Sequence, residues 1–139
     1  ETEVPGIFRF TIQLFTTEEM IRKVSKQFEK VVDVISAHYY LLDDVIMQEV
    51  ALYKVPTREL IGSDQIERLM RKHYARILYV EQEFLIIEKT GNHDEINALF
   101  RELEKYGLLE FVRSGTLAIT KESNHIHDQL EEIARMQTT

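Results

Sequence analysis

The stretch EFLIIEKTGNHDEINALFRELEKY, residues 83–106, decides the fold because its structural period changes within a few residues. Residues 83–90 are rich in apolar and β-branched side chains and predict a strand, which Gly91 ends. Asn92 followed by Glu95 is a capping signature for the start of a helix. Apolar residues then recur at helical spacing, which predicts a helix with one buried face. That face would consist of Ile96, Leu99, Leu103 and Tyr106.

The same order of patterns occurs near the N-terminus. FRFTIQLF, residues 8–15, alternates apolar and polar side chains and predicts a half-buried strand. Thr16 and Glu19 then form a capping-box signature for a helix, and residues 32–41, VDVISAHYYL, predict a second strand. We interpret the two regions as an internal repeat of a strand–helix–strand unit. The apolar positions of the first helix, offset by 75 from those of the second, are Ile21, Val24, Phe28 and Val31.

The residues between the two copies complete an α+β domain. Residues 46–55 and 76–80 predict two further strands, and a helix begins near Asp64. Residues 46–119 therefore have the order β-α-β-β-α-β, which is typical of a ferredoxin-like sandwich with two helices on one face of a four-stranded antiparallel sheet. The inward side chains of the helix near Asp64 are predicted to be Ile66, Leu69 and Met70.

The expected organisation has three parts. Residues 1–43 correspond to only the second half of such a domain, residues 44–121 form a complete ferredoxin-like domain, and residues 122–139 form a polar tail, helical or disordered. A β-α-β half would leave one face uncovered and should pack against the second domain or another chain. The chain also begins without methionine, so we expect a truncated or partly represented protein whose first β-α-β is missing.

The composition is that of an ordinary globular protein, with 44% hydrophobic and 29% charged residues. The net charge of −7 opposes the neutralisation of phosphates, so nucleic acid is not an expected partner. The chain has no cysteine and therefore no disulfide, thiolate metal site or thiol nucleophile. Its apolar runs are far shorter than the roughly 20 residues that span a membrane, so we expect a cytoplasmic protein without membrane association.

Several histidines could carry chemistry. His125 and His127 form an H-x-H pair in the polar tail, where one helical face would not present both, so solvated residues are favoured over a metal site. His38 could ligate a metal, but a histidine of a sheet or interface is favoured. His73 is predicted on the outer side of its helix.

The remaining polar motifs have structural explanations. KTGNHDE, residues 89–95, could bind an anion at a helix N-terminus, but a capped helix start is favoured. Three acidic pairs would lie in a helical first turn, a connection and the tail. The sequence therefore predicts no catalytic residues, no metal site and no cofactor. The acidic pairs are Glu18–Glu19, Asp43–Asp44 and Glu131–Glu132.

Arg113 is the unusual residue of the last strand. In LLEFVRSGTLAIT, residues 108–120, an alternating strand would place Arg113 in an apolar stripe. The last strand of this topology is an edge of the sheet, where Gly115 is predicted to mark a bulge or a close backbone approach. Arg113 is predicted to point to the rim of the sheet or to reach a carboxylate across a subunit contact. Arg113, Ser114 and Gly115 thus form a candidate fold and assembly signature.

An ordered set of motifs resembles the small regulatory subunit of acetolactate synthase, also called acetohydroxyacid synthase, over residues 7–121. The motifs are EKVVDV (29–34), ISAHYY (35–40), QEVALYKV (48–55), EKTG (88–91) and EFVRSGTLAITK (110–121).

This resemblance implies an N-terminal ACT domain, of which residues 1–43 would be the second half, and a ferredoxin-like C-terminal domain, in a homodimer. It also implies a non-catalytic role: binding and activating a separate catalytic subunit that uses thiamine diphosphate, in branched-chain amino acid biosynthesis. It further implies feedback inhibition, usually by valine. The main effector-binding loop of the family would lie in the missing half. We therefore assign no effector-binding residue, and we expect residues 1–139 alone to bind valine weakly or not at all.

Two other functions remain open at this stage. One is a stand-alone ACT-type regulatory protein that senses an amino acid without a synthase partner. The other is a small enzyme on the ferredoxin-like fold, with His38 or His73 as acid–base group. The sequence shows no set of polar groups converging on either histidine, which disfavours the enzyme.

Overall fold

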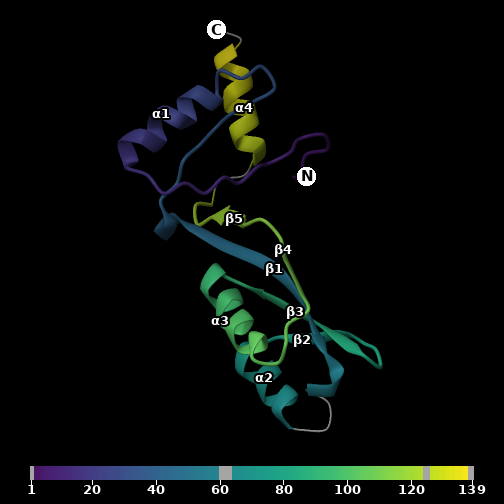
Figure 1. Cartoon of the computed structure of the whole chain (residues 1–139). Helices are drawn as coiled ribbons and strands as arrows, with labels where there is room; N and C mark the ends of the chain where they lie inside the picture. The colour runs from purple at the N-terminus through teal and green to yellow at the C-terminus, as the bar shows by residue number, and fades with distance from the viewer. Residues whose placement is uncertain (1, 60–63, 124–125, 138–139) are drawn as a thin grey trace. The chain divides into compact units, whose positions relative to one another are not determined.

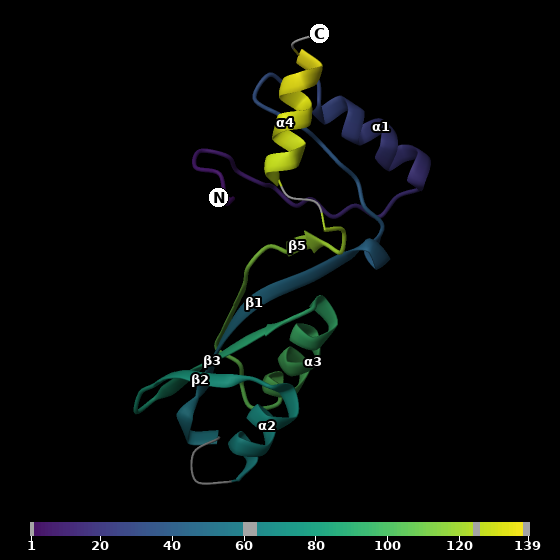
Figure 2. The same cartoon turned by 180° about the vertical axis from the view of Figure 1, so that it is seen from behind.

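The computed structural model describes residues 2–59, 64–123 and 126–137. The chain divides into two compact units. We call Met47–Leu117 the sheet unit, and we call Glu1–Ile46 together with Ala118–Thr139 the terminal unit. Figures 1 and 2 show both units from opposite sides. None of the helices in the described ranges is long and apolar enough to cross a membrane.

The predicted β-α-β-β-α-β order is confirmed. The sheet has the strand order β2-β3-β1-β4, with each neighbouring pair antiparallel, and the short strand β5 also pairs with β1. Both helices cover the same face of this sheet (Figures 1 and 2). The protein therefore has the α+β, ferredoxin-like fold. The elements are β1 (Val45–Pro56), α2 (Gln65–His73), β2 (Arg76–Val80), β3 (Phe84–Gly91), α3 (His93–Glu104), β4 (Glu110–Arg113) and β5 (Leu117–Thr120).

The start of α3 explains why the sequence changes period at Gly91. The Asn92 side chain accepts a hydrogen bond from the Glu95 backbone N–H at 2.9 Å, and the Glu95 carboxylate accepts one from the Asn92 N–H at 2.8 Å. A Cβ atom at Gly91 would lie 2.5 Å from the Glu95 carboxylate, so a larger residue would disrupt this capping box. The favoured capped helix start is thus what forms.

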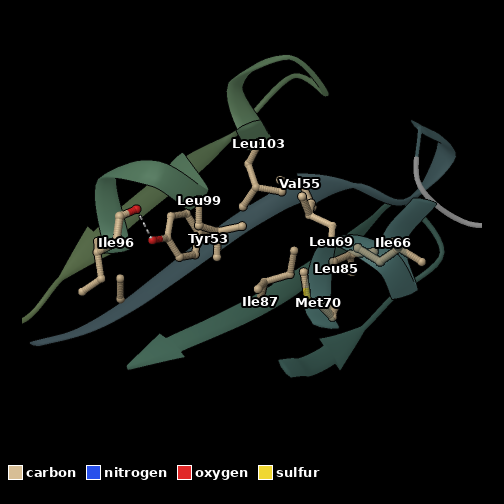
Figure 3. Close-up of a cluster of buried hydrophobic side chains, with 11 residues drawn as sticks. Tyr53, Val55, Ile66, Leu69, Met70, Leu85, Ile87, Ile96, Leu99 and Leu103 are labelled. Atoms are coloured by element: carbon tan, nitrogen blue, oxygen red, sulfur yellow. Dashed lines mark hydrogen bonds between the residues drawn. The ribbon is translucent and has the colours of Figure 1, made fainter. Parts of the chain in front are cut away.

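The core of the sheet unit lies between the sheet and the two helices (Figure 3). Tyr53, at the centre of β1, is fully buried, and its hydroxyl donates a 2.8 Å hydrogen bond to the backbone carbonyl of Ile96 in α3. Burial raises the pKa of Tyr53, which stays neutral and can donate this bond. The predicted inward residues of both helices are confirmed in the core except Tyr106, which lies beyond the end of α3 and is partly buried against the core. Its members are Ala51, Tyr53, Val55, Ile66, Leu69, Met70, Leu85, Ile87, Ile96, Leu99 and Leu103.

The terminal unit contains α1 (Glu18–Phe28) and α4 (Ile126–Gln137), but two predicted strands are wrong. Residues 8–15 and 32–41 are not strands. A strand forms only where a neighbouring strand accepts its backbone hydrogen bonds, and in the described ranges neither segment belongs to a sheet. The predicted helix is confirmed. It begins one residue later than expected, because Thr17 rather than Thr16 caps it by accepting the Met20 N–H.

The repeated helical pattern does not produce repeated packing. Ile96, Leu99 and Leu103 of α3 are fully buried, whereas no residue of α1 is. Phe28, the counterpart of Leu103, is 40% exposed. The difference arises because α3 covers a sheet and α1 does not. Residues 8–15 also expose a series of large apolar side chains: Phe8, Phe10, Ile12, Leu14 and Phe15.

Candidate functional site at the end of the β1–β4 pair

Strand β4 ends just before Ser114, because the side-chain oxygen of Ser114 takes the place of its backbone carbonyl as the acceptor of a hydrogen bond from β1. The Ser114 N–H donates to the Val50 carbonyl at 2.8 Å, but the Val50 N–H donates to the Ser114 hydroxyl oxygen at 2.9 Å. A continued ladder would use the Ser114 carbonyl for that second bond. The hydroxyl itself donates to the Gly115 carbonyl at 2.9 Å. The R-S-G motif therefore divides the predicted last strand into β4 and β5.

Gly115 does not mark a close backbone approach, so that alternative is wrong, and the other alternative, a bulge, stays a prediction. No atom lies within 4 Å of the position that a Cβ would occupy, and its φ is not in the left-handed region. The β1–β4 register contains no shift from Lys54 to Ala51, where it ends opposite Arg113. Gly115 thus follows the end of the β4 ladder in open space.

Arg113 points into the sheet unit and forms an ion pair with the buried carboxylate of Glu49. Arg113 Nε donates to Glu49 Oε2 at 3.0 Å, and Arg113 Nη2 bonds the same oxygen. Glu49 is only 6% exposed. Arg113 is predicted to point to the rim of the sheet or to reach a carboxylate across a subunit contact, whereas the carboxylate it reaches belongs to the same chain. Because β4 is an edge strand, this ion pair fixes it to the central strand β1.

Three further side chains complete this group, which we call the Glu49 cluster: Glu49, Arg113, His93, Asn97 and Thr116. Thr116 donates from its hydroxyl to Glu49 Oε1 at 3.1 Å, and His93 Nδ1 lies 3.5 Å from the same oxygen. Arg113 Nη1 donates to Asn97 Oδ1 at 3.2 Å, and Arg113 Nη2 lies 2.8 Å from His93 Nδ1. The cluster therefore joins β1, α3, β4 and the segment before β5.

The electrostatics of Glu49 favour its charged form despite burial. Burial alone would raise the pKa of this carboxyl. The hydrogen bonds from Arg113 and Thr116, and then the charge of Arg113, outweigh burial and hold the pKa below its usual value. Since both oxygens of Glu49 have hydrogen-bond donors, the carboxylate acts as a structural anchor and is poorly placed to serve as a general base.

Acid is expected to remove the stabilisation that Glu49 provides. Because its pKa is lower in the folded chain, the contribution is fully present above the unfolded value, near 4.5, and is lost as the pH falls through the folded pKa. Glu49→Gln removes this titration. The difference in free energy of unfolding between wild type and Glu49→Gln should therefore be larger at about pH 7 than at about pH 3. Urea titrations at the two pH values measure it, and a difference that did not change with pH would contradict the prediction.

His73 is not on the outer side of α2, so that prediction is wrong. Its side chain is 9% exposed, and Nε2 lies 3.2 Å from Glu102 Oε1 of α3. Lys72 binds the same carboxylate. The hydrogen bond from Lys72, and with it His73, lowers the pKa of Glu102. These residues link the two helices side by side on the same face of the sheet.

His38 lies in the terminal unit and is exposed. It lines an open hollow of about 380 Å³ together with residues of α1, such as Arg22 and Lys26, and with Tyr39 and Tyr40. In the described ranges, no group of three or more side chains is arranged to hold a metal ion. His125 lies outside the described residues, as does the side chain of His127.

Sequence reasoning identified Arg113 but missed its partners Glu49, Asn97 and Thr116. A signal for Glu49 was present, because by strand alternation it points to the same inward face of β1 as Ala51, Tyr53 and Val55. Arg113 likewise falls among the apolar residues of one face of β4. Opposite charges on the inward faces of two neighbouring strands are a recognisable pattern for a buried ion pair. Thr116 and Asn97 carry no comparable signal, since both are ordinary polar residues.

The comparisons with known proteins agree with this fold. The family described as the small subunit of acetolactate synthase matches residues 48–122. Similar proteins include the acetolactate synthase small subunits of Aquifex aeolicus, 32% identical over 88% of this chain, and of Mycobacterium leprae, 33% identical over 86%. The chain spans 64% and 70% of the lengths of these two relatives.

A solved structure is also similar. The crystal structure of the acetolactate synthase small subunit from Thermotoga maritima matches with a TM-score of 0.69 and 26% sequence identity. The match covers 79% of this chain and 68% of that chain. The matched residues 48–122 begin within β1, run through β5 and include every member of the Glu49 cluster. On the family match and on relatives that are more than 30% identical, this chain belongs to the acetolactate synthase small-subunit family.

Proposed function

We propose that this chain is a non-catalytic regulatory subunit that binds and activates the catalytic subunit of acetolactate synthase. The observation that carries the proposal is the family match over residues 48–122, which covers nearly all of the sheet unit and a few residues beyond it. The catalytic subunit would supply thiamine diphosphate and the chemistry. The Glu49 cluster supports a non-catalytic role because its carboxylate and guanidinium are engaged with each other.

We further propose that residues 1–43 are the second half of an ACT domain, in a homodimer that confers inhibition by valine. Support comes from residues 8–15, which alternate as a strand does but belong to no sheet in the described ranges, and from their exposed apolar side chains. Phe10 is 84% exposed and Phe15 is 97% exposed. Contiguous apolar side chains of this kind mark surfaces that become covered by another chain.

Coupling to valine requires that the effector bind two states of the assembly with different affinity. A domain without catalytic groups can provide this coupling, because the effector only has to shift the equilibrium between the two states. The proposal therefore places regulation in the terminal unit and leaves the chemistry with the partner.

Adding the full-length form of the protein to its cognate catalytic subunit is expected to raise turnover and to make turnover sensitive to valine. The measurement is the initial rate of acetolactate formation at increasing ratios of the two proteins, with and without valine. The catalytic subunit with an equal amount of an unrelated acidic protein is the control. Unchanged turnover and no complex in a pull-down would contradict the proposal. Saturable binding of an amino acid without such a complex would favour the stand-alone sensor.

A further inference from the structure

His93 is the exposed member of the Glu49 cluster, and it touches both charges of the Glu49–Arg113 ion pair. Its Nδ1 atom lies 2.8 Å from Arg113 Nη2 and 3.5 Å from Glu49 Oε1. The His93 side chain is 62% exposed, whereas Glu49 is buried. Protons from solvent therefore reach the imidazole, while the carboxylate beside it is shielded.

The hydrogens of the Arg113 guanidinium decide which form of the imidazole fits this geometry. Nε and Nη2 both donate to Glu49 Oε2, and Nη1 donates to Asn97 Oδ1. Nη2 carries one more hydrogen, and His93 Nδ1 lies within reach of it. A guanidinium has only donors and stays protonated, so Nδ1 has to be the acceptor in this contact. The imidazole that fits is thus the neutral one with its proton on Nε2.

A second proton changes which partner His93 can bind. When Nδ1 is protonated, its hydrogen faces a hydrogen of Arg113 Nη2, and both groups carry positive charge. An acceptor within reach is Glu49 Oε1, 3.5 Å away, which already accepts one hydrogen bond from Thr116. A carboxylate oxygen can accept a second bond, so a small turn of the ring provides the charged imidazole with a partner. Each protonation state therefore has its own partner in the cluster.

The charged side chains that contact His93 within the described ranges are those of the ion pair itself. Glu49 faces it from β1, and Arg113 faces it from β4. Thr116, before β5, and Asn97, one turn along α3, bind the same ion pair and are uncharged. The change of partner therefore depends on the charge of His93 relative to a single carboxylate and a single guanidinium.

We propose that His93 is a proton-dependent switch in the Glu49 cluster. Neutral His93 accepts a hydrogen bond from Arg113 and ties this last residue of β4 to α3. Protonated His93 releases Arg113 and donates to Glu49, a bond that joins α3 to β1 and leaves the edge strand β4 less firmly held. Imidazole is the side-chain group that ordinarily changes charge between about pH 5 and 8. The switch lies within one chain and requires neither valine nor the catalytic subunit.

Nuclear magnetic resonance of the isotope-labelled chain tests the switch directly. At neutral or higher pH, the ring nitrogen shifts of His93 are expected to show a protonated Nε2 and an unprotonated Nδ1. On acidification, the side-chain Nε–H resonance of Arg113 is expected to move with the same midpoint as the His93 ring. A neutral His93 that carries its proton on Nδ1, or an Arg113 resonance that does not follow the ring, would overturn the proposal.

A variant that accepts a hydrogen bond but does not titrate separates the switch from a purely structural role. His93→Gln offers an amide oxygen to Arg113 at every pH. Hydrogen exchange of β4 peptides is corrected for the intrinsic pH dependence of exchange. Between about pH 7.5 and pH 5.5, protection is expected to fall about fivefold in the wild type and less than about twofold in His93→Gln.

His38→Gln is the matched control, because it removes an exposed histidine of the terminal unit. It is expected to keep the wild-type response of β4 to pH. The same pH response in the wild type and in His93→Gln would show that another group is responsible and would overturn the proposal.

Discussion

Replacing Arg113 with methionine is expected to lower the free energy of unfolding of the sheet unit by about 3 kcal/mol. Methionine keeps most of the aliphatic stem, but it removes the guanidinium, whose Cζ lies 6.0 Å from the centre of the Phe111 ring, and leaves the carboxylate of Glu49 without its main hydrogen-bond donor. Glu49 is 6% exposed, so water cannot replace that donor. Native-state hydrogen exchange of peptides from β1 and β4 measures the loss within the sheet unit.

The matched control is Lys54→Met. Lys54 and Glu110 pair across the same two strands, on the face of the sheet that the helices leave open. Their nitrogen and oxygen are 3.9 Å apart and the Glu110 side chain is 64% exposed, so the loss is expected to be below about 1 kcal/mol. If both variants lost the same free energy, burial would not distinguish the two pairs, and the anchoring role of Arg113 would be wrong.

The fold of the sheet unit could be predicted because its signals are local and agree with one another. The change of period at Gly91, the Asn92–Glu95 cap and the alternation in β1 each favour a single type of element. The residues near Asp64 do the same for α2. Once the order β-α-β-β-α-β is known, few topologies remain, and the antiparallel sandwich is the commonest of them.

The Glu49 cluster could be predicted only in part. Arg113 attracted attention because a charge interrupted an apolar stripe. Its partner lies 64 residues away in the sequence, and it becomes a neighbour only because β4 pairs with β1 at Ala51 and Arg113. Sequence pattern therefore indicated that Arg113 needs a carboxylate. The register of the sheet decides which carboxylate it is.

The strands predicted at residues 8–15 and 32–41 show the opposite case. Their alternation and β-branched composition are as favourable as those of β3, yet they belong to no sheet in the described ranges. Strand propensity expresses how well a residue fits a pleated, half-buried surface, so it has no effect where no neighbouring strand provides that surface. Helix α1 forms in the same unit because its hydrogen bonds are internal to the segment.

Replacing Ile96 with alanine is expected to destabilise the chain far more than replacing Ile21, the residue at the same position of the repeated pattern. Ile96 is fully buried beneath the sheet, so its loss leaves a cavity and costs about 3 kcal/mol. Ile21 is only half-buried on α1, and its loss is expected to cost less than about 1 kcal/mol. Urea unfolding followed by far-ultraviolet circular dichroism, with hydrogen exchange to assign each unit, measures both.

The comparison is matched because the same side chain is removed from the same position of two amphipathic helices. Alanine has the higher helix propensity and favours both helices by a similar amount, so the difference between the variants reports packing alone. Equal losses would mean that α1 is packed in solution as tightly as α3, which contradicts the half-buried position of Ile21. Unequal losses would show that a sequence repeat specifies two similar helices, while a covering sheet determines which of them carries the stability of the chain.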